Sequence, residues 1–394
     1  MVEATSRPAR VVIDTGAIER NVVALSLHVG DAALCAVVKA DAYGHGALAV
    51  ARAAVRAGAD WLAVAVVDEG LSLRAAGIDV PILLLSEPPP GAMADAQGAW
   101  LTPTLYTEAG IEAASAAARR GLVPWPVHLK VNTGMNRVGA RPDDVVALAR
   151  RVVADPMLAL GGVWTHLAMA DEPDAPETDA QLELYERVLD ELVAAGIDPG
   201  VRHAANSAGV LAHPRARYDL VRPGIALYGI APTAAVDGRV ELEPALSLTA
   251  EVSFIKQVRA GERVSYGLRH TFEADTVVAT VPIGYADGVA RRLGMVGGAV
   301  LIGGRRHPIV GVITMDQLMV DCGGAEVAVG DEVVLLGSQG DESIGVGEWS
   351  DLLDLIPYEI VCGFGPRLPR ESPGTAEPLN LRVVEPLSSE LPAP

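Results

Sequence analysis

Cysteine is scarce in this sequence, and its spacing argues against two classes of small domain. The 394 residues include three cysteines, Cys35, Cys322 and Cys362, which lie far apart and form no CxxC pair. An odd and dispersed set of thiols predicts neither a disulfide framework nor a zinc site. We therefore expect a fold that depends on its apolar core, with no metal centre.

Basic side chains are outnumbered by acidic ones, 31 against 50, so the formal net charge is −19. Such a surface repels nucleic acid and anionic lipid, and we expect neither as a partner. The first ten residues, MVEATSRPAR, lack the apolar segment of a signal peptide. No run of about 18 apolar residues is present, so no membrane span is expected. The sequence therefore predicts a cytoplasmic protein.

From residue 34 to about residue 230, apolar strand-like runs alternate with helix-forming stretches. This alternation predicts parallel strands joined by right-handed crossovers. Eight such units in about 200 residues favour a closed (β/α)8 TIM-type barrel over an open, doubly wound sheet. The expected strands are Leu34–Val38, Trp61–Val67, Pro81–Leu85, Trp100–Leu105, Val127–Val131, Gly162–Leu167, Val201–Ala205 and Leu220–Leu227, with helices at Ala47–Ala57, Glu108–Arg120, Asp143–Val153 and Asp179–Ala195.

A change of character near residues 231–244 predicts a second, mostly β domain, because short β-type runs and Gly-rich turns follow a loop rich in Pro and Gly. We expect the barrel over residues 1–240, the second domain over 241–385 and a disordered tail over 386–394. The first run, Ala9–Ile13, is expected to pair with the second domain. Strands are expected at Leu246–Gln257, Thr276–Pro282, Ala299–Ile302, His307–Val312, Gln317–Asp321, Glu332–Gly337 and Leu379–Val384.

Polar side chains gather where the predicted barrel strands end, and barrel enzymes carry their chemistry at these ends. Lys39 ends the first strand, Lys130 lies on the fifth, His166 ends the sixth and Arg222 lies on the eighth. One polar residue at a strand end carries little information. Several at one rim predict a site.

The stretch VVKADAYGHG, residues 37–46, gives the strongest local signal. A lysine at the end of a buried strand must be paired or lose its charge, and a lysine with a lowered pKa serves as an amine nucleophile and a proton carrier. The alternative is that Lys39 extends from the barrel mouth and is only solvated. Gly44 and Gly46 allow backbone to approach a ligand, and the helix expected from Ala47 has an N-terminus that attracts anions. Such a pairing suits pyridoxal phosphate (PLP).

VVKADAYGHG also resembles the PLP-lysine signature of alanine racemases, a family of fold type III PLP enzymes. The resemblance extends from about Val11 to Arg367 and includes GYADG, residues 284–288. It implies a cytoplasmic homodimer whose active site is shared between subunits, and an isomerase that supplies D-alanine for peptidoglycan. Lys39 would form the Schiff base with PLP.

Racemisation removes a proton from one face of Cα and returns one to the other, which two opposed bases do most simply. The resemblance implies Lys39 on one face and Tyr266 of the partner subunit on the other; read alone, Tyr266 would be ordinary packing in a β domain. Arg222 matches the arginine that faces the pyridine nitrogen. Because arginine keeps its proton, the ring would be a weaker electron sink, which favours racemisation over transamination. His166 matches a residue hydrogen-bonded to that arginine.

The remaining site residues follow from the resemblance by position. The phosphate ligands would be Tyr43, Ser207, Gly224, Ile225 and Tyr358, with Gly224 and Ile225 acting through their backbone N–H groups. The substrate carboxylate would meet Arg137 and the backbone N–H of Met315 from the partner subunit. Lys130 matches a lysine that is carbamylated in many relatives, where it holds the arginine in place.

Two positions depart from the family pattern: Asn132 stands where aspartate is usual, and Thr314 where many relatives have cysteine. The first could alter hydrogen bonding around Lys130 and the second could tune substrate access. Alternatives to an alanine racemase are a racemase for serine or a basic amino acid and a non-catalytic PLP-binding protein. A decarboxylase of the same barrel class is disfavoured by Arg222, since those enzymes place an acidic residue at the ring nitrogen.

Overall fold

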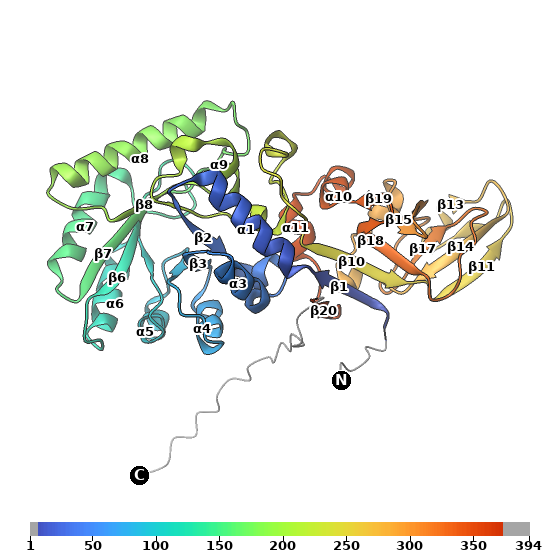
Figure 1. Cartoon of the computed structure of the whole chain (residues 1–394), viewed down its shortest axis with the longest axis horizontal. Helices are drawn as coiled ribbons and strands as arrows, with labels where there is room; N and C mark the ends of the chain where they lie inside the picture. Colours follow the sequence, from blue (N-terminus) through green and yellow to red (C-terminus); the bar gives the residue numbers. More distant parts are fainter. Residues whose placement is uncertain (1–6, 373–394) are drawn as a thin grey trace, which may run out of the picture.

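The computed structural model describes residues 7–372, in which a parallel barrel is followed by a β-rich region (Figure 1). Two parallel four-stranded sheets form the barrel wall, in the orders β4-β3-β2-β9 and β5-β6-β7-β8. A parallel bridge from Leu83 to Thr102 joins β4 to the β5 segment. On the other side, Asp219 N–H donates to Arg202 O and Arg222 N–H to Ala205 O, which closes the barrel between β8 and β9. The predicted α/β barrel is confirmed.

The barrel strands lie inside a layer of helices, and local sequence signals set several of the helix ends. Asp14 caps α1 by accepting from Ala17 N–H at 3.0 Å, and Thr107 caps α6 by accepting from Gly110 N–H at 2.9 Å. The strands are β2 Ala33–Val37, β3 Trp61–Val64, β4 Ile82–Leu84, β5 Thr104–Leu105, β6 Trp125–Lys130, β7 Leu158–Trp164, β8 Val201–His203 and β9 Leu220–Val221. The helices are α1 Thr15–Val29, α2 Lys39–Tyr43, α3 Ala47–Arg56, α4 Val67–Ala75, α5 Met93–Gly98, α6 Glu108–Ala118, α7 Val145–Ala154, α8 Pro176–Ala194 and α9 Ser207–Ala212.

Several predicted barrel strands have other bounds in the structure. Trp100–Leu105 is a strand only over Thr104–Leu105, and Gly162–Leu167 begins earlier, at Leu158, and ends at Trp164. The run expected to end at Leu227 stops at Val221, and the apolar residues Ile225–Tyr228 form a 3-10 turn. Pro223 has no N–H to donate to a strand, so the buried apolar run continues in another conformation. The run expected to end at Val67 stops at Val64, and α4 begins at Val67.

The β-rich region contains β1, because Ala9–Ile13 pairs antiparallel with β10 and parallel with β20. Its largest sheet has the order β16-β15-β18-β10-β1-β20, with β19 paired to β18, and smaller sheets are β11-β14-β17 and β12-β13. The strands are β10 Leu246–Glu251, β11 Phe254–Val258, β12 Arg263–Val264, β13 His270–Thr271, β14 Thr276–Val281, β15 Ala299–Ile302, β16 Arg305–Pro308, β17 Leu318–Asp321, β18 Glu332–Gln339, β19 Glu342–Ile344 and β20 Arg370–Glu371, and the helices are α10 Val346–Leu353 and α11 Pro357–Cys362.

Two predictions for this region need correction, and two cannot be compared with the structure. The single run Leu246–Gln257 is two strands, β10 and β11, that belong to different sheets. The run His307–Val312 begins earlier and ends at Pro308. The expected strand Leu379–Val384 and the expected tail 386–394 lie outside the described residues. No helix within residues 7–372 is both long and apolar enough to cross a membrane.

Candidate active site

Lys39 lies two residues after the end of β2 and precedes a turn of left-handed helix. The four residues Ala40–Tyr43 have φ angles between 51° and 55°, and Gly44 follows with φ 80°. At about 1–2 kcal/mol for each non-glycine residue, this turn costs about 4–8 kcal/mol. The sequence predicted only a short Gly-containing turn here, because Ala and Tyr give no local sign of a left-handed conformation.

Two side chains from other segments, Glu69 and Arg370, and one from the turn itself, Asp41, hold this left-handed turn. Ala40 N–H donates to Glu69 Oε1 at 2.6 Å, Ala47 N–H donates to Asp41 Oδ1 at 2.7 Å, and Arg370 Nε donates to Gly44 O at 3.2 Å. The contact with Asp41 corrects one expectation. Because that carboxylate bonds the first N–H of α3, this helix end is not an open anion site.

A different set of groups forms a polar cradle near the end of β9. Ser207 Oγ accepts hydrogen bonds from Gly224 N–H at 2.8 Å and from Ala226 N–H at 3.2 Å. A Cβ atom added to Gly224 would lie 2.3 Å from Tyr43 Oη. The structure therefore brings together three of the predicted phosphate ligands, Tyr43, Ser207 and Gly224, and no side chain larger than glycine fits between them.

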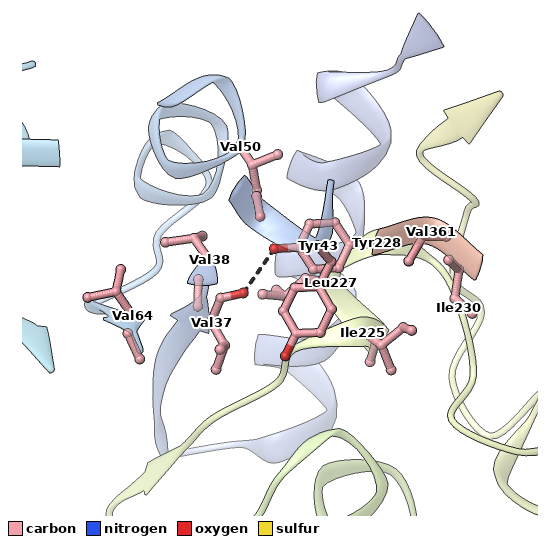
Figure 2. Packing of buried hydrophobic residues seen from close by; sticks show 14 of the residues in the cluster. Val37, Val38, Tyr43, Val50, Val64, Ile225, Leu227, Tyr228, Ile230 and Val361 are labelled. Atoms are coloured by element: carbon pink, nitrogen blue, oxygen red, sulfur yellow. Dashed lines mark hydrogen bonds between the residues drawn. The ribbon is translucent and has the colours of Figure 1, made fainter. Parts of the chain in front are cut away.

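Aromatic rings support this cradle from one side. The ring of Tyr43 lies 5.0 Å from that of Tyr228 and 6.0 Å from that of Tyr358, so Tyr358 also lies near the cradle. Figure 2 shows Tyr43 and Tyr228 packed beside Ile225 and Val361, with the hydroxyl of Tyr228 bonded to Val37 O at 2.9 Å. That bond ties the cradle to the last residue of β2, the strand that precedes Lys39.

Arg222 lies deep in the barrel and is 3% exposed. It donates to Thr165 O at 2.9 Å, to Ala204 O at 3.0 Å and to His203 Nδ1 at 2.8 Å. Its distance to His166 Nδ1 is 3.5 Å, so the contact that the resemblance implied is the longest of the four. Burial lowers the pKa of Arg222 to about 10, which still leaves it charged at neutral pH.

Two buried histidines beyond Arg222 were missed by the sequence analysis. His203 accepts from Arg222 at Nδ1, so its proton is on Nε2, which lies 3.0 Å from His128 Nδ1. Burial and the Arg222 charge lower the pKa values of both, that of His128 to about 3. Side chains along β6 and β8 alternate between the barrel interior and its exterior. This alternation is the one sequence signal that would have suggested an inward orientation for His128 and His203.

Lys130 lies next to these groups and is 3% exposed. Its Nζ sits 4.2 Å from the centre of the Trp164 ring, and the Arg222 guanidinium carbon lies 4.5 Å from the same ring. Burial, followed by the charges of Arg222, Arg137 and Lys39, lowers the pKa of Lys130 to about 7. No salt bridge joins Lys130 to a carboxylate within residues 7–372.

The pKa of Lys39 is lowered chiefly by burial and then by the charge of Arg137, while Glu69 and Cys362 oppose the shift. Lys39, Lys130, Arg137 and Arg222 therefore interact as one electropositive group. Burying a positive charge without a partner is costly, and an anionic ligand would offset that cost. The group is therefore suited to an anionic ligand.

Arg137 is exposed and follows a loop that is shaped by Asn132. Asn132 Oδ1 accepts from Asn136 N–H at 2.9 Å, and Asn132 Nδ2 donates to Asn136 Oδ1 at 2.9 Å. An aspartate could not make the second bond. The departure at Asn132 therefore acts within this loop, and none of the Asn132 side-chain bonds in residues 7–372 goes to Lys130.

Tyr266 and Met315 lie in the β-rich region, with exposures of 71% and 52%. Within residues 7–372, no hydrogen bond or charge interaction joins either side chain to Lys39. Thr314, beside Met315, donates from Oγ1 to Gln317 O at 2.8 Å. One chain thus groups the predicted cofactor residues but leaves the predicted second base on its surface.

Comparison with known proteins shows the family of the chain. Residues 13–232 match the family model for the alanine racemase N-terminal domain, and residues 245–372 match that for the C-terminal domain. An alanine racemase of Symbiobacterium thermophilum is 48% identical over 92% of this chain and 97% of its own. The structure of alanine racemase from Streptomyces coelicolor A3(2) is 40% identical with a TM-score of 0.89, covering 94% of this chain and 98% of its own. A histidine racemase from Leuconostoc mesenteroides subsp. sake is 31% identical with a TM-score of 0.86, covering 94% and 99%.

Proposed function

The chain belongs to the alanine racemase family and interconverts L- and D-alanine, and we propose that it does so with PLP and with two bases from two subunits. The observation that supports this most is the left-handed turn, which places Lys39 and Tyr43 on one short segment beside the cradle of Ser207 and Gly224. Lys39 is the residue we propose to bond PLP.

The residues present fit PLP. A phosphate suits the cradle because Tyr43, Ser207 and Tyr358 offer hydroxyl groups and Ile225 offers a backbone N–H, without a lysine of their own. The N–H of Gly224 donates to Ser207 Oγ in this structure and would bind the phosphate in place of that contact. The nearby cations match its negative charge. When bound, PLP supplies the electron withdrawal that weakens the Cα–H bond of an amino acid.

The proton transfers then fall to side chains. Lys39, whose pKa is lowered by burial, takes or returns the Cα proton on one face. Tyr266 of the partner subunit does the same on the opposite face, and its exposure on its own chain is consistent with a role across an interface. Arg137 and the backbone N–H of Met315 from the partner bind the substrate carboxylate, which fixes Cα between the bases.

Arg222 and Lys130 set the electrostatics of this proposal. Arg222, with His166 beside it, would face the ring nitrogen of PLP and, because it keeps its proton, would leave that nitrogen unprotonated. Burial lowers the pKa of Lys130 to about 7, and no salt bridge joins it to a carboxylate within residues 7–372, so its neutral amine is available for carbamylation. A carbamate on Lys130 would supply a negative charge close to the positive charges of Arg137 and Arg222.

The wider role is proposed on the same basis. The chain divides into a PLP-binding barrel over 1–240 and a second domain over 241–385 that gives Tyr266 to the other subunit of a homodimer. The enzyme acts in the cytoplasm and supplies D-alanine for peptidoglycan.

Complementation between two inactive variants tests the shared site. Lys39→Ala and Tyr266→Phe should each abolish racemisation of L-alanine, with Tyr266→Phe still binding PLP and showing its yellow absorbance. Mixed and re-associated, they should recover about one quarter of the wild-type rate, because half of random dimers are hybrids and each hybrid has one intact site of two. Lys256→Ala and Tyr106→Phe are the controls and should keep full activity. Absence of any recovery would refute the partner role of Tyr266.

A second substrate deserves a test because of the histidine racemase match. Rates should be compared on alanine, serine, lysine and histidine under identical conditions with added PLP. We expect alanine to be fastest. A faster rate on a basic amino acid would assign the chain to a different substrate within the same family.

A further inference from the structure

Glu69 joins the ends of two neighbouring barrel strands at the point where Lys39 emerges. It lies on α4, and its Oε2 atom accepts hydrogen bonds from Ala65 N–H at 2.8 Å and Val66 N–H at 3.3 Å, just after β3. Its Oε1 atom accepts from Ala40 N–H at 2.6 Å, just after β2. Both oxygens of one half-buried carboxylate are therefore used to connect the two segments.

The bond to Ala40 has a special position, because Ala40 follows Lys39 and is the first residue of the left-handed turn. In this conformation the peptide N–H of Ala40 points at Glu69 Oε1. We propose that Glu69 is a positioning residue for Lys39, which holds the left-handed turn by its Ala40 contact and supplies the negative charge that faces the lysine amine. This inference rests on the proposed role of Lys39 as the PLP-bonding base.

The charges around Lys39 give this role a measurable consequence. Burial and Arg137, from the loop after β6, lower its pKa, whereas Glu69 from α4 and Cys362 from α11 raise it. Lys130 on β6 also interacts with Lys39, as does His166 after β7. Removing the Glu69 charge therefore leaves Lys39 facing an excess of positive groups, and its pKa falls further.

Two substitutions separate the charge from the contact. Glu69→Gln keeps the size of the side chain but removes the charge and leaves one acceptor oxygen for two sets of N–H groups. Glu69→Asp keeps the charge but shortens the side chain by one methylene, which withdraws it from Ala40. Asp68→Asn is the matched control, because Asp68 is the exposed neighbour on the same helix and its carboxylate makes no hydrogen bond or salt bridge within residues 7–372.

The pKa of Lys39 can be measured without activity, because the sequence contains three lysines, Lys39, Lys130 and Lys256. The full chain, freed of PLP, is acetylated with limiting acetic anhydride at a series of pH values, and each lysine is quantified by peptide mass mapping. Exposed Lys256 is the internal reference. The midpoint is the pH at which a lysine is acetylated at half of its maximal rate. In Glu69→Gln we expect the midpoint for Lys39 to fall by about 0.5 to 1 pH unit relative to wild type, because a nearby opposite charge is lost. Asp68→Asn should match wild type.

PLP uptake tests the positioning part. The yellow absorbance of lysine-bound PLP should develop at least several-fold more slowly in Glu69→Asp than in Asp68→Asn, while the Lys39 midpoint stays near that of wild type.

An unchanged midpoint in Glu69→Gln would overturn the electrostatic role, and unchanged uptake in Glu69→Asp would overturn the positioning role. If Glu69→Gln does not fold, a normal midpoint with slow uptake in Glu69→Asp supports the proposal and a normal rate overturns it. Wild type that takes up no PLP would instead refute the proposed function, and the acetylation result would still stand.

Discussion

Lys130 should make the stability of the PLP-free protein depend on pH. Its pKa falls from an ordinary value of 10.5 to about 7 in the folded chain because of burial and three neighbouring cations. Between these two values the unfolded chain binds a proton that the folded chain has released. Stability therefore rises with pH from about 7 to about 10.5, and it is lowest where the folded protein must hold Lys130 protonated.

The size of this effect follows from the difference between 10.5 and 7. At about 1.4 kcal/mol per pH unit, the full effect approaches 5 kcal/mol, which is an upper value for a buried lysine. From pH 7.5 to pH 9.0, the free energy of unfolding should increase by about 2 kcal/mol through Lys130 alone. Lys39 adds to the rise in the same direction, since its pKa is also lowered.

Lys130→Met isolates the contribution, because methionine has similar length and retains contact with the Trp164 ring. The measurement is urea unfolding of wild type and variant at closely spaced pH values, in buffer freed of carbon dioxide so that no carbamate forms. The variant should be more stable than wild type at pH 7.5, and the difference should narrow towards pH 9. Lys256→Met, at an exposed position, should follow wild type. Parallel pH profiles for wild type and Lys130→Met would refute the reasoning.

Two further substitutions test the cradle and the β-rich region. Gly224→Ala places a Cβ atom 2.3 Å from Tyr43 Oη, so the dissociation constant for PLP, measured by equilibrium dialysis, should rise by at least about tenfold; Gly91→Ala, where an added Cβ meets nothing within 4 Å, should leave it unchanged. Asp287→Asn removes a fully buried charge whose oxygens accept from Arg7 at 2.7 Å and from Gly284 N–H at 2.9 Å, and urea unfolding should show a loss of about 2–4 kcal/mol. A loss below that measured for Asp68→Asn would contradict the importance of the buried network.

The order of barrel elements was predictable because each strand is a short apolar run bounded by turn residues. The errors have a common cause. Ile225–Tyr228 is as apolar as a buried strand, but the Pro223-Gly224 pair ends the ladder and the same side chains are buried as a 3-10 turn. Hydrophobicity reports that a segment is buried, whereas conformation depends on which backbone groups remain free to pair.

The candidate site was predictable to a different extent at different residues. Lys39 could be identified because its neighbours form a specific motif, but the left-handed turn could not, since it is held by Glu69 and Arg370, 29 and 326 residues from their bonded partners. His203 was missed because a lone histidine on a strand has no distinguishing local pattern. Such residues are recognised only once the barrel closes and places them beside Arg222.

Arg222 also determines which groups can exchange protons at this site. No salt bridge joins it to a carboxylate within residues 7–372, and burial together with its positive charge lowers the pKa values of His166, His203 and His128, which keeps these histidines neutral. At neutral pH these histidines therefore offer no readily transferred second proton, although they line the barrel interior near the cradle. Lys39 and Lys130 are the groups whose pKa values are lowered from that of a free lysine, and neither amine has a hydrogen-bond partner among residues 7–372. Both lysines belong to the barrel, and a reaction that needs a second base on the opposite face of Cα calls for a group from elsewhere, which is the role proposed for Tyr266 of a partner subunit.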